Sequence, residues 1–368
     1  MVQFENYFKD GIVNAGNVSR LKKVFEKLRN KEKVTVVGLG GSITEGAWSS
    51  KPEYKYFSRF CTFLKDYFNT DLIEDYDVGI GSTTSLFGYF RLQKDVLNYK
   101  PDLVTVDFSV NDDLEDNTMK YVYESLIKRI LSEPNAPAVI MMHFTKKDGS
   151  NCQQIHSPVA KFYNIPALSY RDAYYPLVEN GTIKWEDISP DSIHPNDVGH
   201  KAAATLLSEF VKAVDNNELG DSSDYVLRED YLYGPIYANP RLIEAKDIKV
   251  EERGSFEVEM SPHHRHLLAL SAKAPNKPLI FKVEGTSIGF SYLKWASGEF
   301  GTAKITIDDN EHIIEGHFNA AWEGYLDTII LESNLVKREH TVKIELLDEK
   351  PEGSTGEKFM ICYLLLAD

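Results

Sequence analysis

The pattern of apolar segments divides this sequence into two parts of different fold class. As far as Val214, segments of helical periodicity alternate with short apolar runs, whereas beyond about Ala245 strand-like segments follow one another without helices. Alternation predicts an α/β domain with a doubly wound parallel sheet, and many short strands predict an all-β sandwich of the jelly-roll kind. We therefore expect an α/β domain at 1–215, a polar linker at 216–244 and a sandwich at 245–368.

The expected elements follow from apolar periodicity and from β-branched runs between turn-forming residues. The expected helices are 18–28, 56–68, 85–97, 121–131 and 199–214, and the strands between them lie at Val34, near Leu72, at Leu103, at 138–142 and at 166–168. In the second part, strands are expected at 277–283, 287–292, 303–307, 328–331, 340–347 and 359–366.

Composition limits the partners of the protein. The chain has 368 residues, of which 42% are hydrophobic and 12% aromatic, a mixture typical of globular enzymes. Its formal charge of -15 argues against nucleic acid or an anionic membrane as the main partner. No apolar run approaches the roughly 20 residues that cross a bilayer. Neutral substrates are therefore expected.

Cysteine usage and the first residues bear on the compartment. Cys61, Cys152 and Cys362 are few and far apart, which favours neither a disulfide framework nor a zinc site. Residues 1–20 lack the charged-then-apolar layout of a signal peptide. We expect buried thiols, no metal, no cofactor and a cytoplasmic location.

A first candidate site residue, Ser42, follows the apolar run 34–39. The run predicts a buried parallel strand, and the carboxyl ends of such strands are where open α/β sheets bind ligands. Gly40 and Gly41 allow the backbone to turn sharply and to approach a substrate closely. A plain glycine-rich turn between strand and helix is the alternative interpretation.

A second candidate, Asn111, directly follows the apolar run 102–110. That run predicts another buried strand, which delivers its last residues to the same edge of the sheet. An asparagine amide is a neutral donor of the kind that stabilises the oxyanion in acyl transfer. The alternative is an Asn-Asp turn that caps the following helix.

The third candidate is the pair Asp191 and His194, whose spacing of three residues lets the carboxylate fold back onto the imidazole. Pro195 prevents a helix from running through this loop, and Asn196 or Asp197 can cap the helix that begins afterwards. A serine becomes a nucleophile when such an Asp-His pair accepts its proton. The three candidates together predict a serine esterase.

These stretches resemble the SGNH hydrolases of the GDSL type, with Gly-Gly-Ser-Ile-Thr at 40–44 standing where that family often has Gly-Asp-Ser-Leu. The resemblance covers about the first 215 residues. It implies a flavodoxin-like three-layer fold and ester hydrolysis without a metal. It assigns Ser42 as nucleophile, His194 as base, Asp191 as its orienting carboxylate and Asn111 as an oxyanion donor beside the N–H of Ser42.

One block departs from the family pattern. The family commonly has Asn-x-Gly-x-x-Gly, whose last glycine donates its backbone N–H to the oxyanion. Residues 77–84 read Asp-Val-Gly-Ile-Gly-Ser-Thr-Thr, which puts Ser82 at the matching position and Gly81 one residue earlier. Since any residue except proline keeps its N–H, either Gly81 or Ser82 can serve. A glycine-rich loop that only leads into the next helix is the alternative.

The order of the domains resembles a subgroup of this family. An SGNH domain followed by a carbohydrate-binding-like sandwich is similar to polysaccharide O-acetyl esterases of gut bacteria that act on hemicelluloses such as mannan and xylan; residues 16–23 and 184–190 also resemble them. The resemblance implies removal of acetyl groups from acetylated oligo- or polysaccharides through an acetyl-enzyme. Acyl transfer by the same triad and an inactive glycan-binding protein are the alternatives.

Aromatic residues are candidate sugar contacts, because the apolar faces of sugar rings stack on them. The four candidates are Trp48, Trp185, Trp295 and Trp322, and core packing is the alternative for each. His143 and His156 have no acidic partner at the short spacing of the third candidate pair, and we expect them to be structural.

Overall fold

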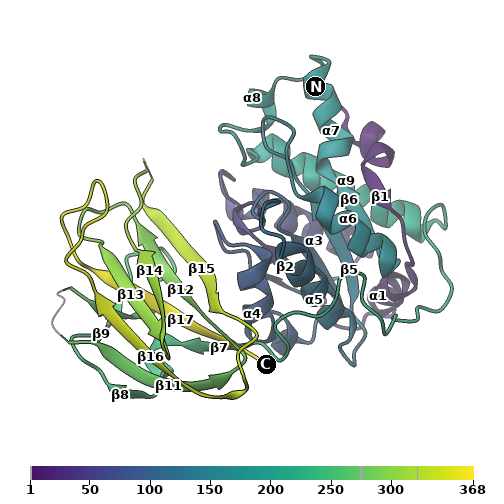
Figure 1. Ribbon diagram of the computed structural model, residues 1–368. Helices are drawn as coiled ribbons and strands as arrows, with labels where there is room; N and C mark the ends of the chain where they lie inside the picture. Colours follow the sequence, from purple (N-terminus) through teal and green to yellow (C-terminus); the bar gives the residue numbers. More distant parts are fainter. Residues whose placement is uncertain (1, 274–276, 321) are drawn as a thin grey trace. The chain divides into compact units, whose positions relative to one another are not determined.

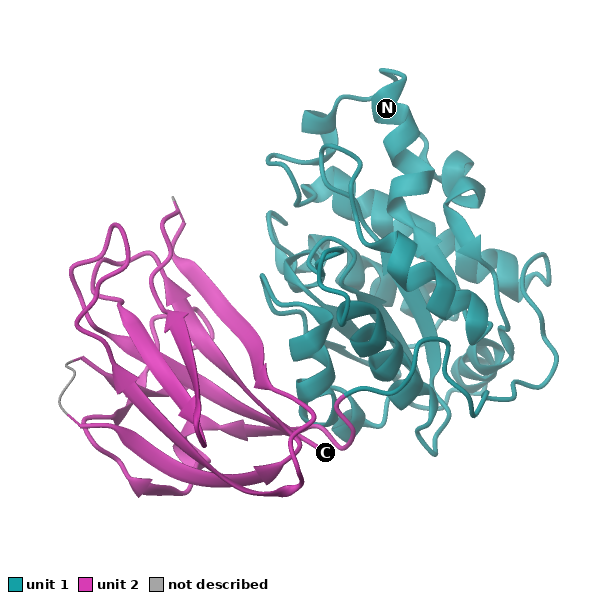
Figure 2. Ribbon diagram, viewed as in Figure 1, with its two compact units in different colours: residues 1–236 teal, residues 237–368 magenta. Residues whose placement is uncertain are grey.

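The computed structural model describes residues 2–273, 277–320 and 322–368. The chain divides into two compact units, Met1–Ile236 and Tyr237–Asp368, which are coloured separately in Figure 2. The division lies inside the segment 216–244 that the sequence marks as a linker. The part of this segment before it belongs to the first unit, because the N–H groups of Leu232, Tyr233 and Gly234 donate to the Glu124 carboxylate.

A six-stranded sheet forms the centre of the first unit, in the order β1-β6-β5-β4-β2-β3 (Figure 1). Its strands are β1 (Ile12–Asn14), β2 (Val34–Gly40), β3 (Ile73–Asp77), β4 (Leu103–Asp107), β5 (Ala138–His143) and β6 (Ala167–Ser169). All neighbours are parallel except β1, which pairs antiparallel with β6 and which the sequence pattern does not predict. Every residue of β2 is buried, as a strand covered on both faces requires.

Helices cover both faces of this sheet. They are α1 (Ser19–Arg29), α3 (Tyr56–Tyr67), α4 (Ser85–Asp95), α5 (Met119–Leu131), α6 (Gln153–Phe162), α7 (Tyr170–Glu179) and α9 (Asp197–Asp215), with the single turns α2 (Ser42–Glu45) and α8 (Trp185–Ile188) and the 3-10 segments η1 (Phe4–Gly11), η2 (Pro52–Tyr54) and η3 (Leu97–Tyr99). The crossover from β2 through α3 leads to β3 at one edge of the sheet. The later crossovers lead in the opposite direction, to β4, β5 and β6 in turn. Since such crossovers are right-handed, α3 covers one face, and α4, α5 and α6 cover the other. The three-layer α/β prediction is confirmed.

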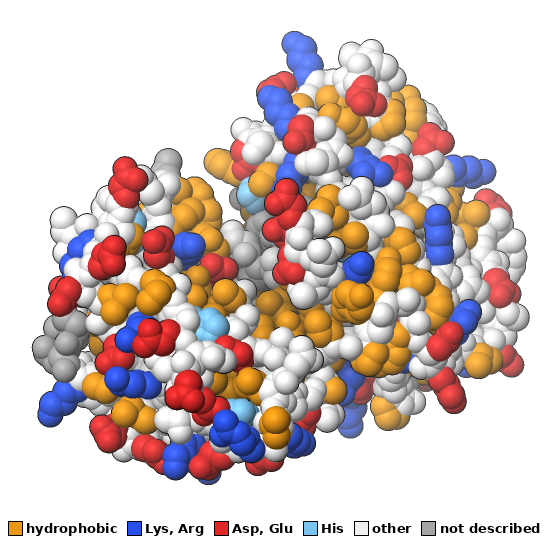
Figure 3. Space-filling view, viewed as in Figure 1, with side chains coloured by type: hydrophobic (Ala, Val, Ile, Leu, Met, Phe, Trp, Pro, Cys, Tyr) orange, Lys and Arg blue, Asp and Glu red, His pale blue; other side chains and the backbone are white. Residues whose placement is uncertain are grey.

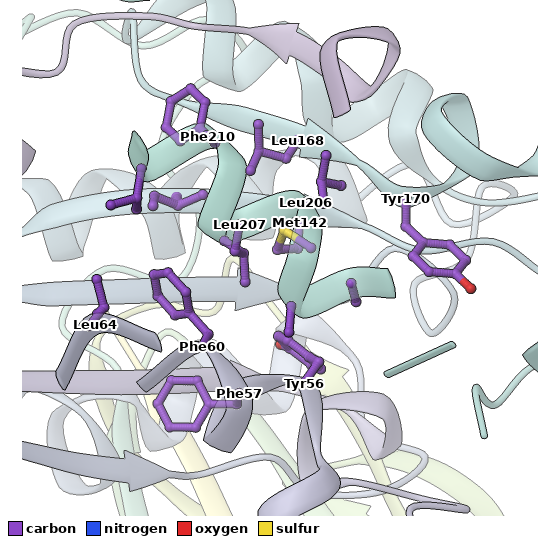
Figure 4. Close-up of a cluster of buried hydrophobic side chains, with 14 of the residues drawn as sticks. Tyr56, Phe57, Phe60, Leu64, Met142, Leu168, Tyr170, Leu206, Leu207 and Phe210 are labelled. Atoms are coloured by element: carbon purple, nitrogen blue, oxygen red, sulfur yellow. The ribbon is translucent and has the colours of Figure 1, made fainter. Parts of the chain in front are cut away.

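The core on the α3 face fixes α9 against the sheet (Figure 4). Phe57, Phe60 and Leu64 recur at helical spacing along α3 and are fully buried. They pack in one cluster with Leu207 and Phe210 of α9. This packing matters for function, because α9 begins directly after the loop that carries Asp191 and His194.

The five predicted helices form within a few residues of their expected bounds, but α6 and α7 are not among them. Each contains a proline, Pro158 in α6 and Pro176 in α7. An internal proline normally argues against a helix, since it removes one backbone hydrogen bond. Burial of apolar side chains such as Val159 and Tyr174 offsets that loss.

The second unit is a sandwich of two antiparallel sheets. Its elements are β7 (Arg241–Glu244), η4 (Ala245–Asp247), β8 (Val250–Glu252), β9 (Glu257–Met260), β10 (Leu268–Ala272), β11 (Leu279–Gly285), β12 (Ser287–Trp295), β13 (Thr302–Ile307), β14 (Asn310–Glu315), β15 (Gly324–Glu332), β16 (Arg338–Leu346) and β17 (Phe359–Ala367). One sheet has the order β15-β12-β17-β10-β9 with β7 on β17, and the other has β14-β13-β16-β11-β8. The all-β prediction is confirmed; β7, which ends the expected linker, and β8, β9, β10 and β14 are additional.

The surface and the thiols agree with the composition. On the face drawn in Figure 3, acidic and basic side chains are interspersed. Cys61, Cys152 and Cys362 are buried free thiols, as expected. Among the helices of the described residues, none has both the length and the apolar character that a bilayer crossing needs.

Candidate active site

Ser42 begins the short helix α2, directly after the buried strand β2. The two glycines before it are required by close contacts. A Cβ atom at position 40 would lie 2.2 Å from Thr44 Oγ1, and one at position 41 would lie 2.5 Å from Asn111 Oδ1. Absence of a side chain at Gly41 therefore brings Asn111 against the backbone that leads into Ser42.

Ser42, His194 and Asp191 form a continuous hydrogen-bonded triad. Ser42 Oγ lies 2.8 Å from His194 Nε2, and His194 Nδ1 lies 2.8 Å from Asp191 Oδ2. The His194 and Asp191 side chains keep 24% and 34% of their surface exposed, so the pair lies open to an incoming substrate. This is the arrangement in which a histidine removes a serine proton while a carboxylate holds the ring.

The Asp191 carboxylate is held by the loop that it belongs to. Its Oδ1 accepts hydrogen bonds from the backbone N–H groups of Ile193 and His194, both at 2.7 Å. Partial burial acts to raise the pKa of Asp191, but the hydrogen bonds from the His194 ring and from these two N–H groups outweigh it and hold that pKa below its ordinary value. Asp191 therefore stays ionised and ready to stabilise an imidazolium.

Neighbouring side chains hold the loop that carries Asp191 and His194. Trp185 donates its indole N–H to the Asp191 carbonyl at 2.6 Å, and Ser189 Oγ donates to the His194 carbonyl at 2.6 Å. Asn196 Oδ1 caps α9 by accepting from the N–H groups of Val198 and Gly199, as its sequence position predicts. Trp185 is only 5% exposed, so little of its ring is accessible for the predicted substrate contact. It instead supports the catalytic loop, residues 189–196 between α8 and α9.

Backbone donors near Ser42 come from the loop before α4. The Gly81 N–H already donates to Glu45 Oε2 at 2.7 Å. Ser82 is exposed and has a φ of 56°, in the left-handed region where the matching family position has glycine. Across the described residues, no hydrogen bond is made by the Ser82 N–H, which makes Ser82 the better candidate for the oxyanion donor of the two predicted residues.

Asp112, the neighbour of Asn111, ties the second candidate loop to two helices. Its Oδ1 accepts from the N–H of Ser85 at 2.7 Å, and its Oδ2 lies 2.9 Å from His156 Nε2. Asp112 thus caps α4, an earlier helix rather than the following one. His156 is buried and structural as expected, but its carboxylate partner is 44 residues away in the sequence, which is why local spacing did not reveal it.

Trp48 lies on the rim of the triad. Its side chain is 61% exposed, yet its indole N–H donates to Asp191 Oδ2 at 2.7 Å. The predicted sandwich contacts belong to the other unit: Trp295 ends β12, and Trp322 is 49% exposed with its ring centroid 4.8 Å from that of Phe318. Contact of any of these rings with a sugar stays a prediction.

The arrangement supplies all the groups of acyl transfer by a serine. A nucleophile, a base with an orienting carboxylate, and amide donors at Ser82 and Asn111 converge on one edge of the sheet. In the described part of the chain, no three His, Cys, Asp or Glu side chains are grouped so as to hold a metal ion.

Comparison with known proteins gives two kinds of match. Residues 39–202 match the model of the GDSL-like lipase/acylhydrolase family. Two solved structures of a two-domain esterase active on acetylated mannans, one co-crystallised with mannopentaose, are each 29% identical to this chain, with TM-scores of 0.88 and 0.87 and with 98% of each chain covered. No curated protein matches the sequence.

Proposed function

We propose that this protein, a carboxylic ester hydrolase whose residues 39–202 match the model of the GDSL-like lipase/acylhydrolase family, removes O-acetyl groups from acetylated hemicellulose chains or oligosaccharides. The triad of Ser42, His194 and Asp191, with both hydrogen bonds at 2.8 Å, is the observation that carries the reaction class. Mannan is the preferred substrate class and xylan the second. The matched esterase acts on acetylated mannans, and the match extends over both units.

The proposed reaction begins when Ser42 Oγ attacks the acetyl carbonyl while His194 Nε2 accepts its proton. Asp191 stabilises the imidazolium that forms, and His194 returns the proton to the departing sugar oxygen. Water then attacks the acetyl-enzyme with the same histidine as base, and acetate leaves. The oxyanion of both steps is met by the N–H groups of Ser42 and Ser82 and by the amide of Asn111.

Acetate release from an acetylated mannan oligosaccharide mixture tests this function, with the wild type compared with Ser42→Ala. The expected result is loss of acetyl groups by mass from the wild-type reaction alone. Xylan oligosaccharides in a parallel reaction rank the two substrate classes. If no acetylated sugar and no simple aryl acetate is cleaved, the glycan-binding alternative replaces the esterase.

Acyl transfer is the second candidate, because the same triad accepts a sugar hydroxyl in place of water. Adding an unacetylated mannan oligosaccharide to the reaction separates the two. Hydrolysis gives free acetate and leaves the added sugar unchanged, whereas transfer raises the mass of the added sugar by one acetyl group.

A further inference from the structure

We propose that Trp48 is a positioning residue of the triad, whose indole N–H fixes the carboxylate that orients His194. The proposal rests on the esterase function above and goes beyond it, since it assigns Trp48 a role in the chemistry of any ester, with or without a sugar. The sequence marks Trp48 only as a candidate substrate contact.

Hydrogen-bond geometry carries the first step. Asp191 Oδ2 receives two donors, the His194 ring at 2.8 Å and the Trp48 indole N–H at 2.7 Å. The other oxygen, Oδ1, receives two backbone N–H groups at 2.7 Å. Each carboxylate oxygen thus has two protein donors, and Trp48 supplies the only one of the four that comes from outside the catalytic loop.

Exposure makes that outside donor matter. One third of the Asp191 side chain, 34%, is accessible to water. Without the indole, water would compete at Oδ2 with the His194 ring, and besides that ring only the two backbone N–H groups at Oδ1 would restrain the carboxylate. Hydrogen bonds to ionised groups are stronger than neutral ones, so a fixed donor restrains the carboxylate in a way that mobile water does not.

The backbone of Trp48 has a strained conformation. Its φ is 60°, a left-handed conformation that bulky L-residues rarely adopt. Such strain persists only where the surrounding structure over-determines it, and it is concentrated at functional sites.

The surrounding structure does hold the Trp48 loop, residues 46–50, on both sides of the tryptophan. Before it, the carbonyl of Ala47 lies 3.1 Å from His200 Nε2. After it, the N–H and Oγ of Ser50 donate to Asp197 at 2.8 and 2.5 Å. Both partners belong to the first turn of α9, the helix that directly follows the catalytic loop.

His200 is suited to this clamp because it stays neutral. Its Nδ1 accepts from the Tyr56 N–H at 3.2 Å, which places the proton on Nε2, where it is donated to the Ala47 carbonyl. Burial lowers the pKa of His200 to about 4. The first turn of α9 therefore sets the position of both the catalytic loop and the Trp48 loop.

The test replaces the donor and keeps a ring. With an aryl acetate, Trp48→Phe should lower kcat about tenfold, which corresponds to about 1.4 kcal/mol of transition-state stabilisation, with KM and Tm nearly unchanged. Tyr67→Phe is the matched control. It removes an exposed aromatic donor from another carboxylate, since Tyr67 Oη donates to Asp215 at 3.0 Å. These two residues lie at the C-terminal ends of α3 and α9.

A double-mutant cycle separates positioning from a structural role. In an Asp191→Asn background, Trp48→Phe should cost nothing further, because the carboxylate that it positions is gone. An equal loss in both backgrounds, or no loss in the wild-type background, would overturn the proposal. Should Trp48→Phe not fold, a benzothienyl analogue at position 48, in which sulfur replaces the indole N–H, takes its place and is expected to give the same tenfold loss.

Labelling by a fluorophosphonate keeps the proposal testable if the esterase function fails. In this step the Ser42 oxygen forms a bond to phosphorus, the phosphorus–fluorine bond breaks, and His194 takes the serine proton, so no ester needs to be cleaved. Tenfold slower labelling of Trp48→Phe would support the positioning role even if no acetate ester were a substrate. Equal rates, or no labelling of the wild type, would contradict it.

Discussion

The carboxylate of Glu45 accepts a hydrogen bond from the backbone N–H of Gly81, with 2.7 Å between Oε2 and the nitrogen. Glu45 ends α2, the helix that Ser42 begins, so the nucleophile's own helix holds the loop that lies beside it. Since the Gly81 N–H is engaged, the following N–H, that of Ser82, is the one left for an oxyanion.

Removing the Glu45 carboxylate should therefore loosen the loop that contains Gly81 and Ser82. We expect Glu45→Ala to lower kcat toward an aryl acetate by about tenfold, the effect of losing one charge-assisted hydrogen bond. Glu45→Gln keeps an oxygen acceptor and should retain most of the activity. Glu53→Ala, at an exposed acid in η2, is the control. A fully active Glu45→Ala enzyme would show that the loop needs no such support.

The backbone conformation at Ser82 predicts which substitutions are tolerated. Its φ of 56° suits glycine and is hard for a β-branched residue. Ser82→Gly should keep kcat within about twofold, since the N–H donor remains and the strain is removed. Ser82→Val keeps the N–H but forces the loop away at a cost of about 1–3 kcal/mol, and should lower kcat by about fivefold to about a hundredfold. Steady-state kinetics and Tm of both variants decide the matter; equal kcat values would remove Ser82 from the oxyanion site.

Asn111 is predicted to donate to the developing oxyanion. Asn111→Ala should cost ~3 kcal/mol of transition-state stabilisation, about two orders of magnitude in kcat, while the fold stays intact. Asn180→Ala is the control, because the Asn180 side chain accepts hydrogen bonds from Thr182 at an exposed turn. An unchanged rate for Asn111→Ala would remove this residue from the mechanism.

Burial of the Asp107 carboxyl, at the end of β4, predicts that the free energy of unfolding depends on pH. Burial raises its pKa from 3.8 to about 7, against hydrogen bonds from Ser109 that lower it. In the unfolded chain the carboxyl ionises near its ordinary pKa, so the folded state binds more protons between these values and loses stability as the pH rises. The stability of Asp107→Asn relative to the wild type should therefore rise by up to about 4 kcal/mol between pH 4 and pH 7.5.

Urea unfolding at several pH values measures this difference, and Asp148→Asn provides a control of opposite sign. Hydrogen bonds from Ser150 lower the pKa of Asp148, so its ionised form stabilises the fold above its ordinary pKa, and that contribution is lost as the pH falls. The Asp148→Asn variant should lose stability relative to the wild type as the pH rises from below 3.8, the ordinary pKa of Asp148, to just above it, and should change little at higher pH. If the two variants followed the same pH trend, burial of Asp107 would not be the cause.

Local relationships in this molecule are readable from the sequence. The buried strand before Ser42, the three-residue spacing of Asp191 and His194, and the cap at Asn196 each depend on a few consecutive residues, whose periodicity and turn chemistry set the result. For the same reason both fold classes and most of the long helices follow from apolar patterns alone.

Contacts between distant segments are not readable in this way. The bond from Gly81 to Glu45 spans 36 residues, that from His156 to Asp112 spans 44, and that from Trp48 to Asp191 spans 143. No periodicity links such pairs, because their meeting is a product of strand order and helix packing. These long-range supports of the site therefore emerge only from the folded chain, although its reacting groups are visible beforehand.

The short Asp191–His194 loop also has a consequence for refolding. The acid and base are three residues apart and can meet as soon as their loop forms, whereas Ser42 is 152 residues from His194 and meets it only after α9 has docked. A serine-directed probe added during refolding thus reports the closing of that single long-range contact. The rate of labelling therefore measures when this contact forms, independently of how early the helices form.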